Sequence, residues 1–126
     1  MLIAISGLII GCKDAQDKVI LKPENVSKGR RLFAAVGCAN CHSMTGEKLY
    51  GPPLNNIIDS TIKVFRNDTE MALIVDRVYI RKSITEPDFE KPLDFRNSMM
   101  PKPDLTAEEI DCLVDFIIAS NSNRKP

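Results

Sequence analysis

The sequence predicts an all-α domain of three to five helices. Residues 25–36, 68–82 and 106–120 each carry apolar side chains three and four positions apart, which is the spacing of one face of an α-helix. A shorter helix is expected within residues 55–65, and a single turn near residue 38 would make five. The length of 126 residues is that of one domain.

The composition excludes several classes of function. The formal net charge is zero, with eight basic and five acidic residues in the first 63 positions and nine and twelve in the remainder. This mild asymmetry gives no case for a nucleic-acid partner, and we expect a monomer. His42 is the one histidine of the chain, so no metal can be bound by two imidazoles of the same molecule.

The most informative stretch is Cys38-Ala39-Asn40-Cys41-His42. A C-x-x-C-H run is the attachment sequence of c-type haem. Two thiols three positions apart on a helical turn can add to the two vinyl groups of one porphyrin, while His42 turns its imidazole toward the iron. The alternatives are a zinc knuckle and a thiol redox pair, for which one histidine and the distant Cys112 are poor ligands. We therefore expect one covalent haem c, bound through Cys38 and Cys41, with His42 as an iron ligand.

The N-terminal residues predict export and lipid attachment. Residues 1–10 are almost all apolar and too few to span a bilayer, but they suit an export signal, although no Lys or Arg precedes them. Ile9-Ile10-Gly11-Cys12 resembles the lipobox of bacterial lipoproteins, in which the cysteine is lipidated. We expect a signal peptide at 1–11, a lipid-anchored tether at 12–24 and the domain at 25–126, in the bacterial cell envelope on its periplasmic or outer face. An uncleaved short anchor and a buried N-terminal segment are the alternatives.

The first helix is expected to start at Asn25 or Ser27, either of which can serve as its N-cap, and to stop at Gly37. A glycine inside a helix costs roughly 1 kcal/mol relative to alanine. Gly29 therefore predicts that another helix passes close over this point. The apolar stripe of this helix consists of Gly29, Leu32, Phe33 and Val36.

Residues 51–53, Gly-Pro-Pro, predict an extended backbone, because proline fixes its own φ and disfavours helix in the residue before it. One interpretation is a rigid turn. The other is that an exposed carbonyl here accepts the Nδ1 proton of His42, which orients the ring as metal-bound histidines require.

A short helix is expected within residues 55–65, and a longer one follows. Asp68 or Thr69 is expected to cap the longer helix, which runs to about Lys82. Its broad apolar face should pack in the core, with Met71 as a core residue rather than an iron ligand. That face consists of Met71, Ile74, Val75, Val78 and Tyr79.

Residues 86–98 read as a polar loop that leads into Met99-Met100-Pro101-Lys102-Pro103. The alternating prolines keep this stretch extended, so a thioether can project from it. Met100 is the preferred second iron ligand. Met99 is the alternative, and either side chain could instead pack on the porphyrin.

The last helix has the clearest start signal. Thr106 and Glu109 form a capping box, and Leu105 and Ile110 stand at the positions of a hydrophobic staple. Cys112 is expected to be a small apolar residue on this helix. The helix should end near Ser120, and residues 121–126 should fray. The stripe consists of Ile110, Leu113, Val114 and Ile117, with Asp111 and Asp115 outside it.

From Val26 to Ile118 the chain resembles a class I cytochrome c domain, and is especially similar to the monohaem domains found free or fused to respiratory oxidase subunits. The matching residues are Gly29 and Phe33, Pro52, Tyr79-Ile80-Arg81-Lys82-Ser83-Ile84, Met100-Pro101, and Leu113 with Phe116. The resemblance implies a cytochrome c fold of helices around one haem. It also implies that Gly29 and Phe33 cross the pair Leu113 and Phe116, and that the Pro52 carbonyl binds the axial histidine.

The resemblance further implies iron ligated by His42 on one face and by methionine on the other. Such iron has no vacancy for substrate, so we expect an electron carrier rather than an enzyme. Its partners would be a redox protein donor and acceptor, such as a terminal oxidase or reductase of a respiratory chain, and the membrane through Cys12. The alternative is a haem sensor, or a fixed haem subunit of one redox enzyme, in which the methionine is displaced.

Overall fold

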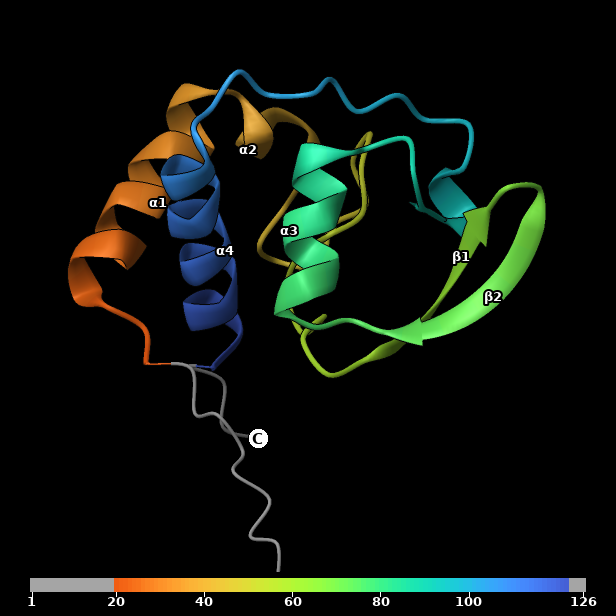
Figure 1. Ribbon diagram of the computed structural model, residues 1–126, viewed down its shortest axis with the longest axis horizontal. Coiled ribbons are helices and arrows are strands. Elements are labelled where there is room, and N and C mark those ends of the chain that lie inside the picture. Colours follow the sequence, from red (N-terminus) through yellow and green to blue (C-terminus); the bar gives the residue numbers. More distant parts are fainter. Residues whose placement is uncertain (1–19, 123–126) are drawn as a thin grey trace, which may run out of the picture.

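The structure, a computed structural model, describes residues 20–122. In chain order the elements are α1 (Pro23–Ala35), α2 (Cys38–Cys41), β1 (Thr61–Arg66), β2 (Thr69–Ile74), α3 (Arg77–Thr85), β3 (Lys91–Pro92), the 3-10 turn η1 (Leu93–Phe95) and α4 (Ala107–Ser122). Figure 1 shows α1 and α4 side by side at one end, the hairpin of β1 and β2 at the other end, and α3 between them. The sheet is antiparallel with strand order β2-β1-β3.

The all-α prediction is not confirmed as it stands. Four α-helices lie within the expected range, and they supply most of the buried apolar side chains. However, residues 61–74 form a hairpin instead of the predicted helices, and β3 adds a short third strand.

The hairpin is built on a two-residue turn. Asn67 and Asp68 have φ values of 46° and 60°, the left-handed values that a type I′ turn requires, and asparagine and aspartate tolerate them better than most residues. The strands then pair from Arg66 opposite Thr69 to Thr61 opposite Ile74. Asp68 is therefore a turn residue and caps no helix.

Met71 is a second correction in this region. It lies on β2, pairs with Val64 of β1 and is exposed, so it is not a core residue. Val64 is fully buried, whereas β2 is an edge strand with little buried side-chain surface. The apolar spacing of residues 71–79 was compatible with a helix, but these residues are divided between a strand and a helix.

Helix α3 begins later than predicted. Asp76 is its N-cap and accepts a hydrogen bond from the Tyr79 N–H at 2.8 Å, and the helix runs to Thr85 rather than Lys82. Ile80 and Ile84 are buried, whereas Val78, expected on the apolar face, is 73% exposed.

Helix α1 begins at Pro23, two residues before the predicted start and inside the predicted tether. Proline suits the first turn of a helix, because the N–H that it lacks would have no partner there. The helix ends where it was expected to end. Val36 is the C-cap, and Gly37 follows with a left-handed φ of 85°.

The predicted close crossing at Gly29 is confirmed. A Cβ atom at Gly29 would lie 1.9 Å from the Cys112 carbonyl oxygen and 2.8 Å from Cβ of Phe116, so only glycine lets α1 approach α4 this closely. The rings of Phe33 and Phe116 pack with centroids 5.4 Å apart. Cys112 is buried, as a small apolar residue would be.

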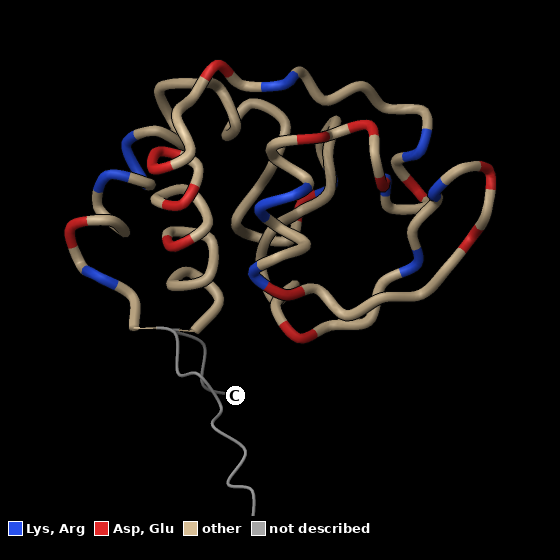
Figure 2. Tube along the Cα trace, viewed as in Figure 1, with Lys and Arg blue, Asp and Glu red and all other residues tan. Residues whose placement is uncertain are grey.

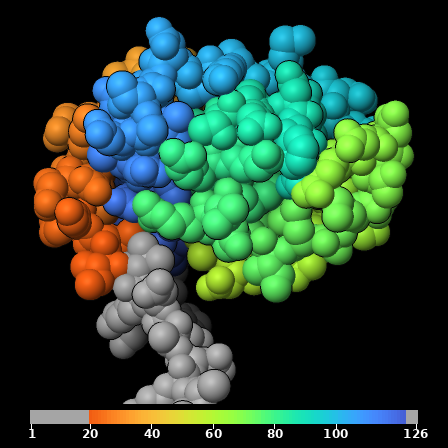
Figure 3. Space-filling view, viewed as in Figure 1, coloured from red at the N-terminus to blue at the C-terminus, as the bar shows by residue number. Residues whose placement is uncertain are grey.

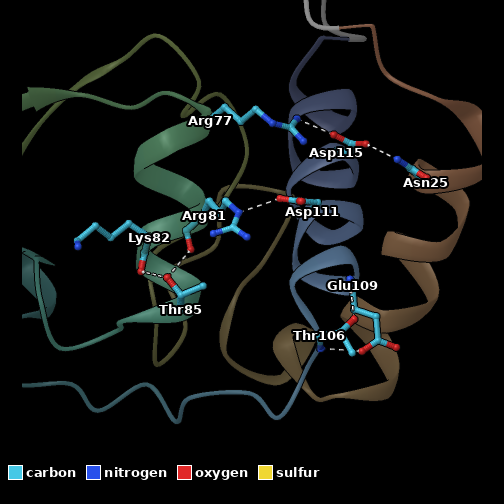
Figure 4. Close-up of polar contacts among 9 residues, drawn as sticks. All are labelled: Asn25, Arg77, Arg81, Lys82, Thr85, Thr106, Glu109, Asp111 and Asp115. Atoms are coloured by element: carbon cyan, nitrogen blue, oxygen red, sulfur yellow. Dashed lines mark hydrogen bonds and ion pairs between the residues drawn. The ribbon is translucent and has the colours of Figure 1, made fainter.

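Charged side chains support the same packing. Figure 2 shows basic positions along α1 and acidic positions along α4, and Lys28 and Glu109 form an ion pair between these helices at 3.9 Å. Asp115 was expected on the outer face of α4, but it is buried. It accepts hydrogen bonds from Arg77 at 2.6 Å and from Asn25 at 3.0 Å, so it joins α4 to both α3 and α1 (Figure 4).

Helix α4 carries the predicted capping box. The Thr106 N–H donates to Glu109 at 3.0 Å, and the Glu109 N–H donates to the Thr106 hydroxyl at 3.2 Å (Figure 4).

At the other end of α4, the predicted fraying does not begin at Asn121, because this residue is helical. Its side chain accepts from the Ile57 N–H and donates to the Leu54 carbonyl, so the end of α4 is tied to the loop before β1. Figure 3 shows α4, α3 and the hairpin forming one continuous face.

Candidate functional site

The Cys38–Cys41 segment is a single helical turn. Gly37 precedes it in the left-handed conformation, and the His42 N–H closes the turn on the Cys38 carbonyl at 2.9 Å. His42 itself is extended and leaves the helix. Two half-buried thiols three positions apart are therefore presented from one turn, with the imidazole next to them. Burial raises the pKa of the Cys38 thiol, so it stays protonated at neutral pH.

The imidazole of His42 is oriented by the loop that follows it. Its Nδ1 lies 2.8 Å from the Pro52 carbonyl oxygen, which is the contact that the family resemblance implies. An Nδ1–H donor fixes the tautomer in which Nε2 carries the lone pair. The ring can therefore offer Nε2 to a metal while the carbonyl holds its orientation.

Gly51 leaves the space that this ring needs. A Cβ atom at Gly51 would lie 2.6 Å from Cε1 of His42 and 3.0 Å from Nδ1. The Gly51 N–H also donates to the Cys41 carbonyl at 2.9 Å, so the loop is fixed to the end of α2. The sequence predicted an extended backbone here but gave no role to Gly51. The signal was its place directly before two prolines.

An apolar cavity of about 510 Å³ lies beside these groups. It is within the usual size range of sites for small molecules and cofactors. Its walls come from α1 and α2, the loop that holds Pro52, α3, α4 and the segment before α4. Its lining includes Cys38, Cys41, His42, Tyr50, Pro52, Tyr79, Met99 and Met100.

Both candidate methionines reach this cavity, but differently. Residues 98–106, which we call the methionine strap, run from the turn after η1 to α4 without helix or strand and cross the top of the domain in Figure 1. Met100 is half-buried, whereas Met99 is 71% exposed. Pro101 and Pro103 keep the strap out of helical conformation, as their spacing predicted.

Two polar features of the wall were missed from the sequence. Tyr79 lines the cavity from α3, and burial raises the pKa of its phenol, so it stays neutral. Glu90 also lines the cavity and is buried, and it pairs with the Arg66 guanidinium from β1. The pairing could not be predicted while residues 61–66 were expected to be helical.

The donor set fits a haem rather than a zinc ion. Two thiols, one imidazole nitrogen and a thioether meet around an apolar cavity, and within residues 20–122 no group of three or more His, Cys, Asp and Glu side chains is placed to hold a metal ion. Tetrahedral zinc needs such a group.

Comparison with known families decides the assignment. Residues 26–120 match the sequence model of the cytochrome c family. The chain belongs to the cytochrome c family. Cytochromes c bind haem c covalently through a cysteine pair, and Cys38 and Cys41 have that spacing, so the cofactor of this cytochrome is haem c. The comparison with curated proteins gave no match.

Family membership supports a haem-containing electron-transfer protein. The predicted signal peptide and Cys12 lie outside the described residues. Within residues 20–122, no helix is both long and apolar enough to cross a membrane.

Proposed function

We propose that this cytochrome c is a membrane-tethered carrier of single electrons between respiratory complexes, with its haem iron ligated by His42 and Met100. The observation that carries the proposal is that one apolar cavity is lined both by the Cys38–His42 turn and by Met100. Haem c supplies the one-electron chemistry when it is bound, and the chain holds and orients it.

The two proposed ligands differ in how they are supported. The ring of His42 is oriented by the Pro52 carbonyl at 2.8 Å, and it occupies space that a Cβ atom at Gly51 would take. Met100 is half-buried, whereas Met99 is largely exposed, which favours Met100. A neutral thioether opposite an imidazole favours ferrous iron and raises the reduction potential.

Filled axial positions favour transfer rather than catalysis. If His42 and Met100 both held the iron, no coordination position would remain for a substrate. The apolar walls exclude water from the ligands and also favour the less charged ferrous state. We therefore propose that this cytochrome is not an enzyme.

The arrangement of the chain suits attachment to a membrane through Cys12. The described chain enters α1 at the end remote from α2 (Figure 1), and thirteen helical residues span about 20 Å. A lipid on Cys12 would therefore hold the domain by the end away from the haem-attachment turn. That turn would stay accessible to a donor and an acceptor such as a terminal oxidase or reductase in the bacterial envelope.

Optical spectroscopy of the purified holoprotein tests the ligation and with it the function. We expect a low-spin c-type spectrum with the weak far-red ferric band of methionine sulfur on haem iron. The reduced protein should not bind carbon monoxide readily. A high-spin ferric spectrum, or rapid carbon monoxide binding, would contradict the carrier and would support a sensor with a displaceable methionine.

A further inference from the structure

The methionine strap has few polar fastenings. The Ser98 carbonyl accepts a hydrogen bond from Nζ of Lys91 at 2.9 Å, and the Met99 N–H donates to the Tyr50 hydroxyl at 3.2 Å. Among the described residues, positions 100–105 make no hydrogen bond, and two of them are prolines without an N–H. The strap is therefore held by hydrogen bonds at Ser98 and Met99, and the described residues make no further hydrogen bond along it until the capping box at Thr106, although Leu105 packs against the core.

The Tyr50 hydroxyl comes from the loop that holds His42. Tyr50 directly precedes Gly51, whose N–H is bonded to the Cys41 carbonyl at 2.9 Å, and Pro52, whose carbonyl holds His42. The phenol therefore belongs to the loop that is fixed to α2 and holds His42. One hydroxyl connects that loop to a backbone 49 residues further along the chain.

This hydrogen bond lies directly before the point where the strap becomes buried, since both methionines line the cavity but only Met100 is half-buried. In an extended chain successive side chains point to opposite sides. Met99 is 71% exposed and Met100 is half-buried, which is the alternation expected. Fixing the Met99 N–H therefore turns the next side chain inward.

We infer that Tyr50 is a positioning residue, whose hydroxyl latches the strap so that Met100 stays directed at the iron. The inference rests on the proposed function, because it assumes that Met100 is the ligand. Tyr50 touches the strap backbone and not the reacting atoms. Its removal should therefore change how easily the methionine is displaced, while haem attachment is unchanged.

Titration of the ferric holoprotein with imidazole measures displacement directly, since imidazole competes with the thioether and abolishes the far-red band. Tyr50→Phe keeps the ring, and its 57% exposure makes the change well tolerated. We expect it to bind imidazole about two- to tenfold more tightly than wild type, the change that one neutral hydrogen bond supplies. Ser120→Ala removes a hydroxyl bonded within α4 at 2.8 Å, and should match wild type.

A second pair of variants separates the latch from a general effect on the pocket. In Met100→Ala no thioether competes, so Met100→Ala and Tyr50→Phe/Met100→Ala should bind imidazole equally. If Tyr50→Phe has wild-type affinity, or if it shifts the affinity equally in both backgrounds, the latch is wrong while the proposed function stands. If wild type lacks the far-red band, the proposed ligation itself fails.

Discussion

The crossing of α1 with α4 and the methionine strap are held in opposite ways. At the crossing, backbones approach so closely that Gly29 has no room for a Cβ atom, and Phe33 packs against Phe116. The strap has no regular structure and is fastened near its start by Lys91 and Tyr50. The crossing should therefore set the stability of the fold, whereas the strap should set how firmly the second iron ligand is held.

The largest effect is expected at the crossing. Gly29→Val should lower the free energy of unfolding by about 3 kcal/mol, because the new side chain meets the Cys112 carbonyl and Phe116. Denaturant unfolding of the holoprotein measures it. Ser27→Ala, at an exposed position on the same helix, should change little. Wild-type stability in Gly29→Val would mean that α1 and α4 can separate without cost.

The buried ion pair behind the crossing should matter next. Asp115→Ala leaves Arg77 and Asn25 without their shared partner, and since Arg77 is 32% exposed, water recovers part of the loss. Breaking a buried pair costs roughly 3–5 kcal/mol, so we expect about 2 kcal/mol here. Asp111→Ala is the matched control, because its pair with Arg81 joins the same helices at 2.9 Å but is exposed, and such pairs contribute about 0–1 kcal/mol. Equal losses would contradict the assigned burial.

Gly51→Ala tests the support of the histidine ligand. Its Cβ atom would meet Cε1 of His42 at 2.6 Å, so the ring must rotate or the loop must shift. We expect a loss of about 1–2 kcal/mol in unfolding free energy, together with altered g-values in the ferric electron paramagnetic resonance spectrum. Thr45→Ala, at an exposed position in the same loop, should leave the g-values unchanged. Wild-type g-values in Gly51→Ala would show that the ring is not confined there.

On the strap, the spectrum should change more than the stability. Met100→Ala should abolish the far-red band and leave haem attached, while unfolding free energy falls by about 1 kcal/mol, less than for a fully buried methionine. Met99→Ala is the matched control and should keep the band. Loss of the band in Met99→Ala alone would place the ligand one residue earlier.

Lipid attachment should affect neither stability nor spectrum. Cys12→Ser should release the protein from membranes, because the thiol that would carry the lipid is gone, with the optical spectrum unchanged. Fractionation of cells followed by haem staining measures the distribution. Continued membrane association would contradict the lipoprotein proposal.

Local signals predicted the parts of the fold that local contacts determine. The capping box at Thr106 and Glu109 and the stop at Gly37 depend on neighbours in the chain. The approach of α1 to the distant α4 was predicted as well, because a glycine inside a helix is itself a local signal of close packing. The haem-attachment turn was likewise predicted from the spacing of its two cysteines alone.

The errors came from contacts between distant segments. Apolar residues at 71–79 fit a helical stripe, but the left-handed turn at Asn67 and Asp68 pairs β2 with β1 instead. On an isolated α4, Asp115 would be expected to face solvent, but in the domain it is bonded by Asn25 of α1 and Arg77 of α3. The bond from Tyr50 to Met99 joins positions 49 residues apart, and the cavity is lined by residues from Phe33 to Ile117, which periodicity does not relate.

The side chain of Asn121 has a consequence for the order in which the domain can assemble. It accepts from the Ile57 N–H at 2.8 Å and donates to the Leu54 carbonyl at 2.9 Å, two residues after the carbonyl that holds His42. A chain growing from its N-terminus therefore exposes its cysteine pair about 80 residues of synthesis before this clamp exists. The histidine loop of a partly made chain therefore lacks the two hydrogen bonds from Asn121, which can form only after α4 has been completed.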